Sequence, residues 1–158
     1  MPTKNEQLLA YLAKKHEKAT VTVLMKICYL IDLVGEKKYG RQISEYRYKR
    51  YTYGPFDQKI YRDLSELQSK GILIAKSDYT ASGEEYIHYS LNEETESVIF
   101  DKLLGAETQI IDEVLESVKG FGARTLTEIA YKTKPMKALN ATLGGNENMS
   151  MSLDLKTK

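Results

Sequence analysis

The sequence predicts one helix-rich α+β domain, and three observations support this prediction. Residues 21–34 form a nearly uninterrupted apolar stretch, which is typical of a buried central helix. Segments with apolar residues at helical spacing lie on both sides of it. Between residues 72 and 91, two short apolar segments flank a polar turn, as in a β-hairpin. The 158 residues, 42% of them hydrophobic and 28% charged, suit a single globular domain.

The chain begins with two predicted helices. Thr3 and Glu6 have the spacing of a capping box, and three leucines at helical spacing continue the pattern to about residue 17. The apolar helix is predicted from about 22 to 34, with its end at Gly35, because glycine is common at helix C-termini. It is apolar nearly all round, so we expect it at the centre of the core with other helices around it.

A tyrosine-rich segment follows, and residues 45–53 predict a β-strand. Gly54 and Pro55 interrupt it. Pro55 fits the first turn of a third helix, where a missing N–H is tolerated. We expect that helix to end at Gly71.

The next segment resembles the wing of a winged-helix domain, with strands at 72–75 and 86–91 around a turn at 77–83. A small antiparallel sheet including this hairpin would complete the fold. Pro135 is expected to close the single domain at residues 1–135, which leaves 136–158 as a polar tail. Three more helices are predicted within the domain, at about 93–103, 106–119 and 123–132. Alternating apolar residues predict a short strand at 149–155 of the tail.

Signals for catalysis, metal binding or cofactor binding are weak. Cys28 is the only cysteine and lies in the apolar helix, where a thiol is expected to be buried and inert. No metal-ligand spacing, nucleophile elbow or phosphate-binding loop is present in the sequence. We therefore expect no enzyme and no cofactor. The longest apolar run is too short to span a membrane, and no membrane partner is expected. A single cysteine cannot form an intramolecular disulfide, so we expect a cytoplasmic protein.

The net charge of +1 conceals an asymmetry along the chain. Residues 35–62 carry a net charge of +5, whereas residues 84–116 carry −9. Such a division indicates either two faces with different partners, steering of a charged partner, or two ordinary solvated surfaces.

Residues 46–53 are the most unusual stretch, because tyrosines alternate with arginines and a lysine. In a strand, Tyr46, Tyr48 and Arg50 would share one face, with Arg47, Lys49, Tyr51 and Tyr53 on the other. Tyrosine and arginine are enriched in protein interfaces, and the same mixture suits nucleic acid. Alternatively, some of the tyrosines fill the core and the cations are merely solvated.

Nucleic-acid binding is the alternative function, through Lys59 and Arg62 on the third helix. The solvent side of that helix is expected to include Asp63 and Glu66 as well, which gives a mixed charge. The turn of the wing carries acidic residues and no arginine or lysine, so it would repel phosphate. These features favour a protein partner over DNA.

Two segments resemble the Panacea domain family, also called SocA-like. Residues 24–32 (LMKICYLID) are similar to the family's apolar helix, with Lys26 near its start. Residues 53–56 (YGPF) match its aromatic-Gly-Pro-apolar motif before a helix. The family often has a tryptophan shortly before Gly-Pro, whereas this chain has Tyr51 and Tyr53 there.

The resemblance implies an antitoxin that binds and neutralises a toxin protein, usually encoded beside it in bacterial or phage genomes. It implies no particular toxin and no oligomeric state. We expect the tyrosine-rich strand and the turn after it to contact the toxin, with tyrosines as apolar anchors and cations paired with acidic groups. The expected partner-binding residues are Arg47, Lys49, Arg50, Tyr51, Tyr53, Gly54 and Pro55.

Overall fold

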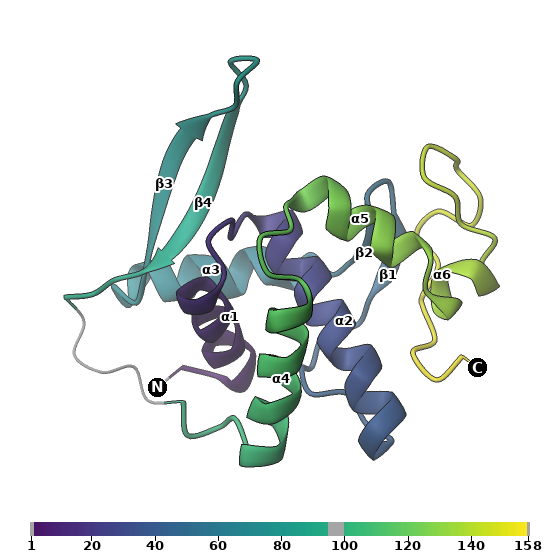
Figure 1. Cartoon of the computed structure of the whole chain (residues 1–158), viewed down its shortest axis with the longest axis horizontal. Coiled ribbons are helices and arrows are strands. Elements are labelled where there is room, and N and C mark those ends of the chain that lie inside the picture. Colours follow the sequence, from purple (N-terminus) through teal and green to yellow (C-terminus); the bar gives the residue numbers. More distant parts are fainter. Residues whose placement is uncertain (1, 95–99, 158) are drawn as a thin grey trace.

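The computed structural model describes residues 2–94 and 100–157, which have the predicted helix-rich α+β fold (Figure 1). Helix α2 passes through the middle of the molecule, and α1, α3, α4 and α5 pack against it. The helices are α1 (Lys4–Lys15), α2 (Val21–Tyr39), α3 (Lys59–Ser69), α4 (Gly105–Ser117), α5 (Ala123–Tyr131) and the short α6 (Lys134–Ala138). The predicted capping box of α1 is confirmed, since Thr3 and Glu6 exchange hydrogen bonds.

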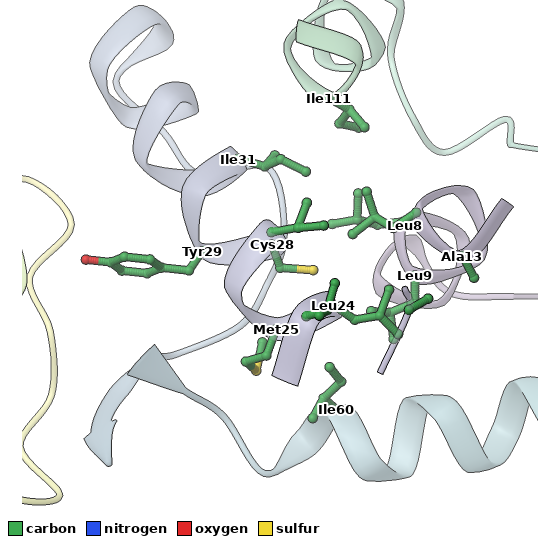
Figure 2. Close-up of a cluster of buried hydrophobic side chains, with 14 of the residues drawn as sticks. Leu8, Leu9, Ala13, Leu24, Met25, Cys28, Tyr29, Ile31, Ile60 and Ile111 are labelled. Atoms are coloured by element: carbon green, nitrogen blue, oxygen red, sulfur yellow. The ribbon is translucent and has the colours of Figure 1, made fainter. Parts of the chain in front are cut away.

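The hydrophobic core is centred on α2, as predicted. Figure 2 shows side chains of α1, such as Leu8, facing Leu24 and Cys28 of α2, with Ile60 and Ile111 closing the cluster. All five of these side chains are fully buried. Burial also raises the pKa of the Cys28 thiol well above its ordinary value, which keeps the thiol protonated and unreactive.

The predicted end of the central helix at Gly35 is wrong. Helix α2 continues to Tyr39 and ends at Gly40, whose φ of 70° is the left-handed conformation of a C-terminal glycine. Gly35 has a different role, because a Cβ at this position would lie 2.8 Å from the carbonyl oxygen of Arg41. The glycine therefore lets the returning chain pack directly against the helix.

The tyrosine-rich segment forms less strand than predicted. Only β1 (Lys49–Tyr51) is a strand, and it pairs antiparallel with β2 (Gly54–Phe56), which places Arg50 opposite Pro55. The prediction that Pro55 begins the third helix is wrong, since α3 begins at Lys59. The missing N–H of proline is tolerated in β2 because β2 has a partner on one side only.

The predicted wing is confirmed as a hairpin that projects from the helical body (Figure 1). Strands β3 (Leu73–Tyr79) and β4 (Glu85–Leu91) form it and are longer than expected. The helix predicted at 93–103 is not seen in its described parts, where residues 93–94 and 101–103 are turns or bends and 100 and 104 are irregular; residues 95–99 lie outside the described residues.

Candidate functional site

The predicted partner-binding residues gather on the β1–β2 hairpin but divide between surface and interior. Burial alternates from Tyr46 to Arg50, with the even-numbered residues buried. On the opposite face Arg47 and Lys49 are exposed, Tyr51 is half-buried, and Tyr53 is 67% exposed at the turn. We call the residues Arg47, Lys49, Tyr51 and Tyr53 the hairpin surface.

Arg50 was expected among the partner-binding residues, but it is not on this surface; it lies on the buried face with Tyr46 and Tyr48, as the strand alternation predicts. Its side chain is 0% exposed and lies 5.4 Å from the centroid of the Tyr131 ring. Its Nη2 donates to the carbonyl oxygens of Thr142 (3.0 Å) and Gly145 (2.9 Å), and Nη1 donates to that of Tyr51. In this structure Arg50 therefore fastens the C-terminal tail to β1 and does not reach solvent.

Gly54 and Pro55 are also buried, and they join the hairpin to the core. The Lys26 ammonium, on α2, donates to the Pro55 carbonyl oxygen at 3.1 Å. Gly54 has a φ of 103°, and a Cβ there would lie 3.3 Å from Cε of Lys26. From the other side, the Tyr131 hydroxyl donates to the Thr52 carbonyl oxygen at 2.8 Å. The turn that carries Tyr53 is thus held at both ends.

The buried Lys26 makes stability depend on pH. Burial lowers its pKa to about 8, whereas an unfolded lysine titrates near about 10.4. Between these values the unfolded chain binds more protons, so the free energy of unfolding rises with pH; below pH 8 the contribution is constant. From pH 7 to pH 9.5, we expect the free energy of unfolding of wild type to rise by about 2 kcal/mol relative to that of Lys26→Met. Urea denaturation of both proteins at each pH measures this change. Free energies of unfolding that vary with pH in the same way in both proteins would contradict the prediction.

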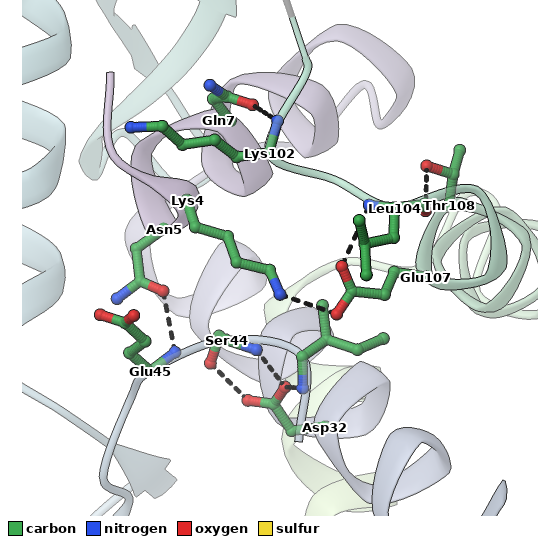
Figure 3. Close-up of polar contacts among 11 residues, drawn as sticks. Lys4, Asn5, Gln7, Asp32, Ser44, Glu45, Lys102, Leu104, Glu107 and Thr108 are labelled. Atoms are coloured by element: carbon green, nitrogen blue, oxygen red, sulfur yellow. Dashed lines mark hydrogen bonds and ion pairs between the residues drawn. The ribbon is translucent and has the colours of Figure 1, made fainter. Parts of the chain in front are cut away.

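A second anchor is the buried carboxylate of Asp32, near the middle of α2 (Figure 3). It accepts hydrogen bonds from the backbone N–H groups of Ile43 (2.9 Å) and Ser44 (2.8 Å) and from the Tyr48 hydroxyl (2.6 Å). Burial raises its pKa, while the bonds from Ser44 and Tyr48 act in the opposite direction. The chain entering β1 is therefore tied to α2.

Other anchors along this segment come from α1 and from the residues before α3. The side-chain oxygen of Asn5 accepts from the Glu45 backbone N–H at 2.9 Å (Figure 3). Asp57 accepts from the backbone N–H groups of Arg47 (2.8 Å) and Lys59 (3.0 Å). Sequence reasoning missed Asp32 and Asn5 because their partners lie elsewhere in the chain. Asp57 did give a local signal, because an aspartate just before a helix is a common acceptor for the first backbone N–H groups.

Aromatic side chains extend the hairpin surface toward α3. The Phe56 ring lies between Tyr51 (6.1 Å between centroids) and Tyr61 (5.7 Å), and Tyr61 is largely exposed. A shallow cleft of about 560 Å³ lies beside Arg47 and Lys59, and a more apolar groove of about 370 Å³ lies beside Tyr53 and Leu143. Sequence reasoning did not assign Tyr61, although its place directly after a buried isoleucine puts it on the outer side of the helix.

The predicted nucleic-acid residues, Lys59 and Arg62, are both exposed on α3. Asp63 was expected on the same solvent side, but it is buried and accepts from the Tyr46 hydroxyl at 2.6 Å. At the wing, the acidic side chains Asp78, Glu84 and Glu85 are all exposed. Within the described part of the chain, no feature favours binding of DNA, and no group of histidine, cysteine or acidic residues could hold a metal ion.

The family model described as the antitoxin SocA-like, Panacea domain matches residues 24–135. The chain belongs to this family. The matched span of this Panacea domain includes most of α2, the β1–β2 hairpin and Tyr131, and so contains the contact between Lys26 and Pro55. Its two sequence motifs, far apart along the chain, therefore meet in the fold. Searches of the curated proteins and of the solved structures found no match. Among the residues described, no helix of this Panacea domain has the length and apolarity to cross a membrane.

Proposed function

We propose that this chain is the antitoxin of a toxin–antitoxin system, acts in the cytoplasm without catalysis, and neutralises its toxin by direct binding. One observation carries the proposal: a rigidly anchored hairpin presents Arg47, Lys49 and Tyr53 to solvent. Membership of an antitoxin family supports the same role in general.

The rigidity of the hairpin favours tight binding. Lys26 and Tyr131 hold its turn, and Asp32 holds the chain that leads into β1. A surface ordered before binding loses less conformational entropy when it meets its partner. Tyr53 offers a large apolar ring with few rotatable bonds, which is the type of side chain that dominates interface energies.

The charge of this surface indicates the kind of toxin surface that it binds. Among the described residues, neither Arg47 nor Lys49 has a carboxylate within ion-pair distance. Both cations are therefore available to acidic groups of the toxin, which would lie around an apolar recess that accepts Tyr53. Binding of the hairpin surface at this recess would block the functional site of the toxin.

Charge reversal on the hairpin surface tests the proposal. We expect Arg47→Glu combined with Lys49→Glu to lower toxin affinity by roughly 100-fold, because two attractive charge pairs become repulsive. The toxin is the protein that co-purifies with the tagged wild-type chain and stops growth when expressed alone, and growth rescue gives a second readout.

The matched control reverses two exposed lysines elsewhere, with Lys18→Glu and Lys119→Glu, and is expected to retain the toxin and rescue growth. If the folded hairpin variant holds the toxin as well as this control does, the hairpin surface is not the interface. If the wild-type chain retains no protein whose expression is toxic, the antitoxin assignment itself fails.

A further inference from the structure

The C-terminal tail lies along the outer edge of β1, joined to it by backbone hydrogen bonds and by one isolated bridge at Ser152 rather than by a full strand. The backbone N–H of Ser150 donates to the Arg50 carbonyl oxygen at 2.7 Å. The backbone N–H of Arg50 donates to the Met151 carbonyl oxygen at 2.8 Å. Leu153 donates to the Tyr48 carbonyl oxygen at 3.0 Å, and Ser152 lies opposite Lys49. Figure 1 shows this last part of the chain beside the β1–β2 hairpin. The edge is therefore able to accept an extended segment.

The tail fits this edge with strain. Three non-glycine residues in or next to it have left-handed backbones, with φ of 52° at Asn140, 56° at Asn148 and 67° at Ser150. Asparagine adopts this conformation readily, whereas serine tolerates it poorly, so the strain is concentrated at Ser150 and is unfavourable there by about 1–3 kcal/mol. Ser150 and Met151 are exposed, and Leu153 is only half-buried. Little burial thus opposes detachment of these residues.

The tail also satisfies Arg50 incompletely. The guanidinium meets neutral acceptors, namely three carbonyl oxygens and the Met149 sulfur at 3.6 Å. Its buried Nε has no hydrogen-bond partner among the described residues. A carboxylate binds a guanidinium more strongly than neutral acceptors do, with two parallel hydrogen bonds. The exposed cations Arg47 and Lys49 on the same strand segment favour an acidic segment for the same reason.

We propose that the outer edge of β1 is a docking site for an extended, acidic segment of a partner protein, and that residues 149–153 occupy it until that segment displaces them. The partner takes over the three backbone hydrogen bonds and places a carboxylate where the Met149 sulfur now contacts Arg50. The identification of this partner with the toxin rests on the proposed function, whereas the docking site itself does not.

The test uses the full-length chain and a labelled peptide that copies residues 141–157. Proline in Ser150→Pro cannot adopt the left-handed backbone and has no N–H to donate to the Arg50 carbonyl oxygen, so this variant releases the chain's own tail from β1. Ser150→Gly relieves the strain, so the chain's own tail binds β1 more tightly. We expect peptide affinity to be at least about tenfold higher for Ser150→Pro than for wild type, and about fivefold lower for Ser150→Gly.

Two versions of the peptide test the chemistry of the segment. One version of the peptide carries Met149→Glu and the other carries Met149→Gln, which has the same shape without the charge. We expect the Ser150→Pro protein to bind the Met149→Glu peptide about tenfold more tightly than the Met149→Gln peptide. Equal binding of the two would overturn the acidic preference. A folded Ser150→Pro protein that does not bind the peptide would overturn the docking site. So would a dimer in which each copy of the chain binds the tail of the other copy and neither binds the peptide.

Hydrogen exchange of the wild-type chain keeps the proposal testable if Ser150→Pro does not fold. The amides of Ser150 and Leu153 are expected to exchange by local opening, far faster than core amides of α2. Exchange only through global unfolding would contradict a displaceable tail. No toxin is used in any of these measurements. Their failure would therefore overturn the docking site without bearing on the antitoxin function, which the charge-reversal experiment tests separately.

Discussion

Replacing Asp32 with alanine is expected to destabilise the domain by about 3–5 kcal/mol. The change leaves the backbone N–H groups of Ile43 and Ser44 and the hydroxyls of Ser44 and Tyr48 without their acceptor, in a place where water does not reach. Each buried donor without a partner is unfavourable by about 1–3 kcal/mol, partly offset because the buried charge is also removed.

Asp32→Asn is the matched control for this prediction. It keeps the shape and one oxygen acceptor, while the two hydroxyls are able to reorient and accept from the new amide. We expect it to lose less than half of the stability that Asp32→Ala loses, as measured by urea denaturation. Equal losses in the two variants, or a loss below about 1 kcal/mol in Asp32→Ala, would show that this carboxylate does not anchor the chain before β1.

Replacing Arg50 with alanine is the second change with a large expected effect. It removes the donors to Thr142 and Gly145 and the contact with the Tyr131 ring, and leaves a cavity beneath the tail. We expect a loss of about 3 kcal/mol in the free energy of unfolding. The tail should also become accessible to a protease that cleaves after Glu147, at enzyme concentrations that leave the wild-type tail intact.

Lys49→Ala is the control for Arg50→Ala, since Lys49 is the neighbouring cation but is exposed. It is expected to change stability by less than about 0.5 kcal/mol and to leave the tail protected. If Arg50→Ala behaves like Lys49→Ala in both measurements, Arg50 does not fasten the tail.

Local chemistry made several features predictable from the sequence. The capping box at Thr3 and Glu6, the burial of Cys28 and the wing hairpin each depend on residues close together in the chain. The burial of Tyr46 and Tyr48 opposite exposed Arg47 and Lys49 follows from strand alternation, which holds even where the backbone is extended without being a formal strand.

The features that could not be predicted depend on distant partners. Arg50 is buried because carbonyl oxygens more than 90 residues later accept its hydrogen bonds. Gly35 looked like a helix end, yet it serves the packing of the chain near Arg41, and the true end at Gly40 lies one turn later. Asp63 looked solvated because its partner, the Tyr46 hydroxyl, lies 17 residues earlier in the chain, before β1.

The central claim is that the hairpin surface binds the toxin, and Tyr53 tests it most directly. Tyr79, at the end of β3 in the wing, is a matched control because it is 64% exposed, against 67% for Tyr53. The measurement is the affinity of the co-purified toxin for wild type, Tyr53→Ala and Tyr79→Ala by titration calorimetry. We predict a loss of roughly 30-fold for Tyr53→Ala and less than about twofold for Tyr79→Ala. A large loss with Tyr79→Ala and none with Tyr53→Ala would place the interface on the wing and contradict the claim.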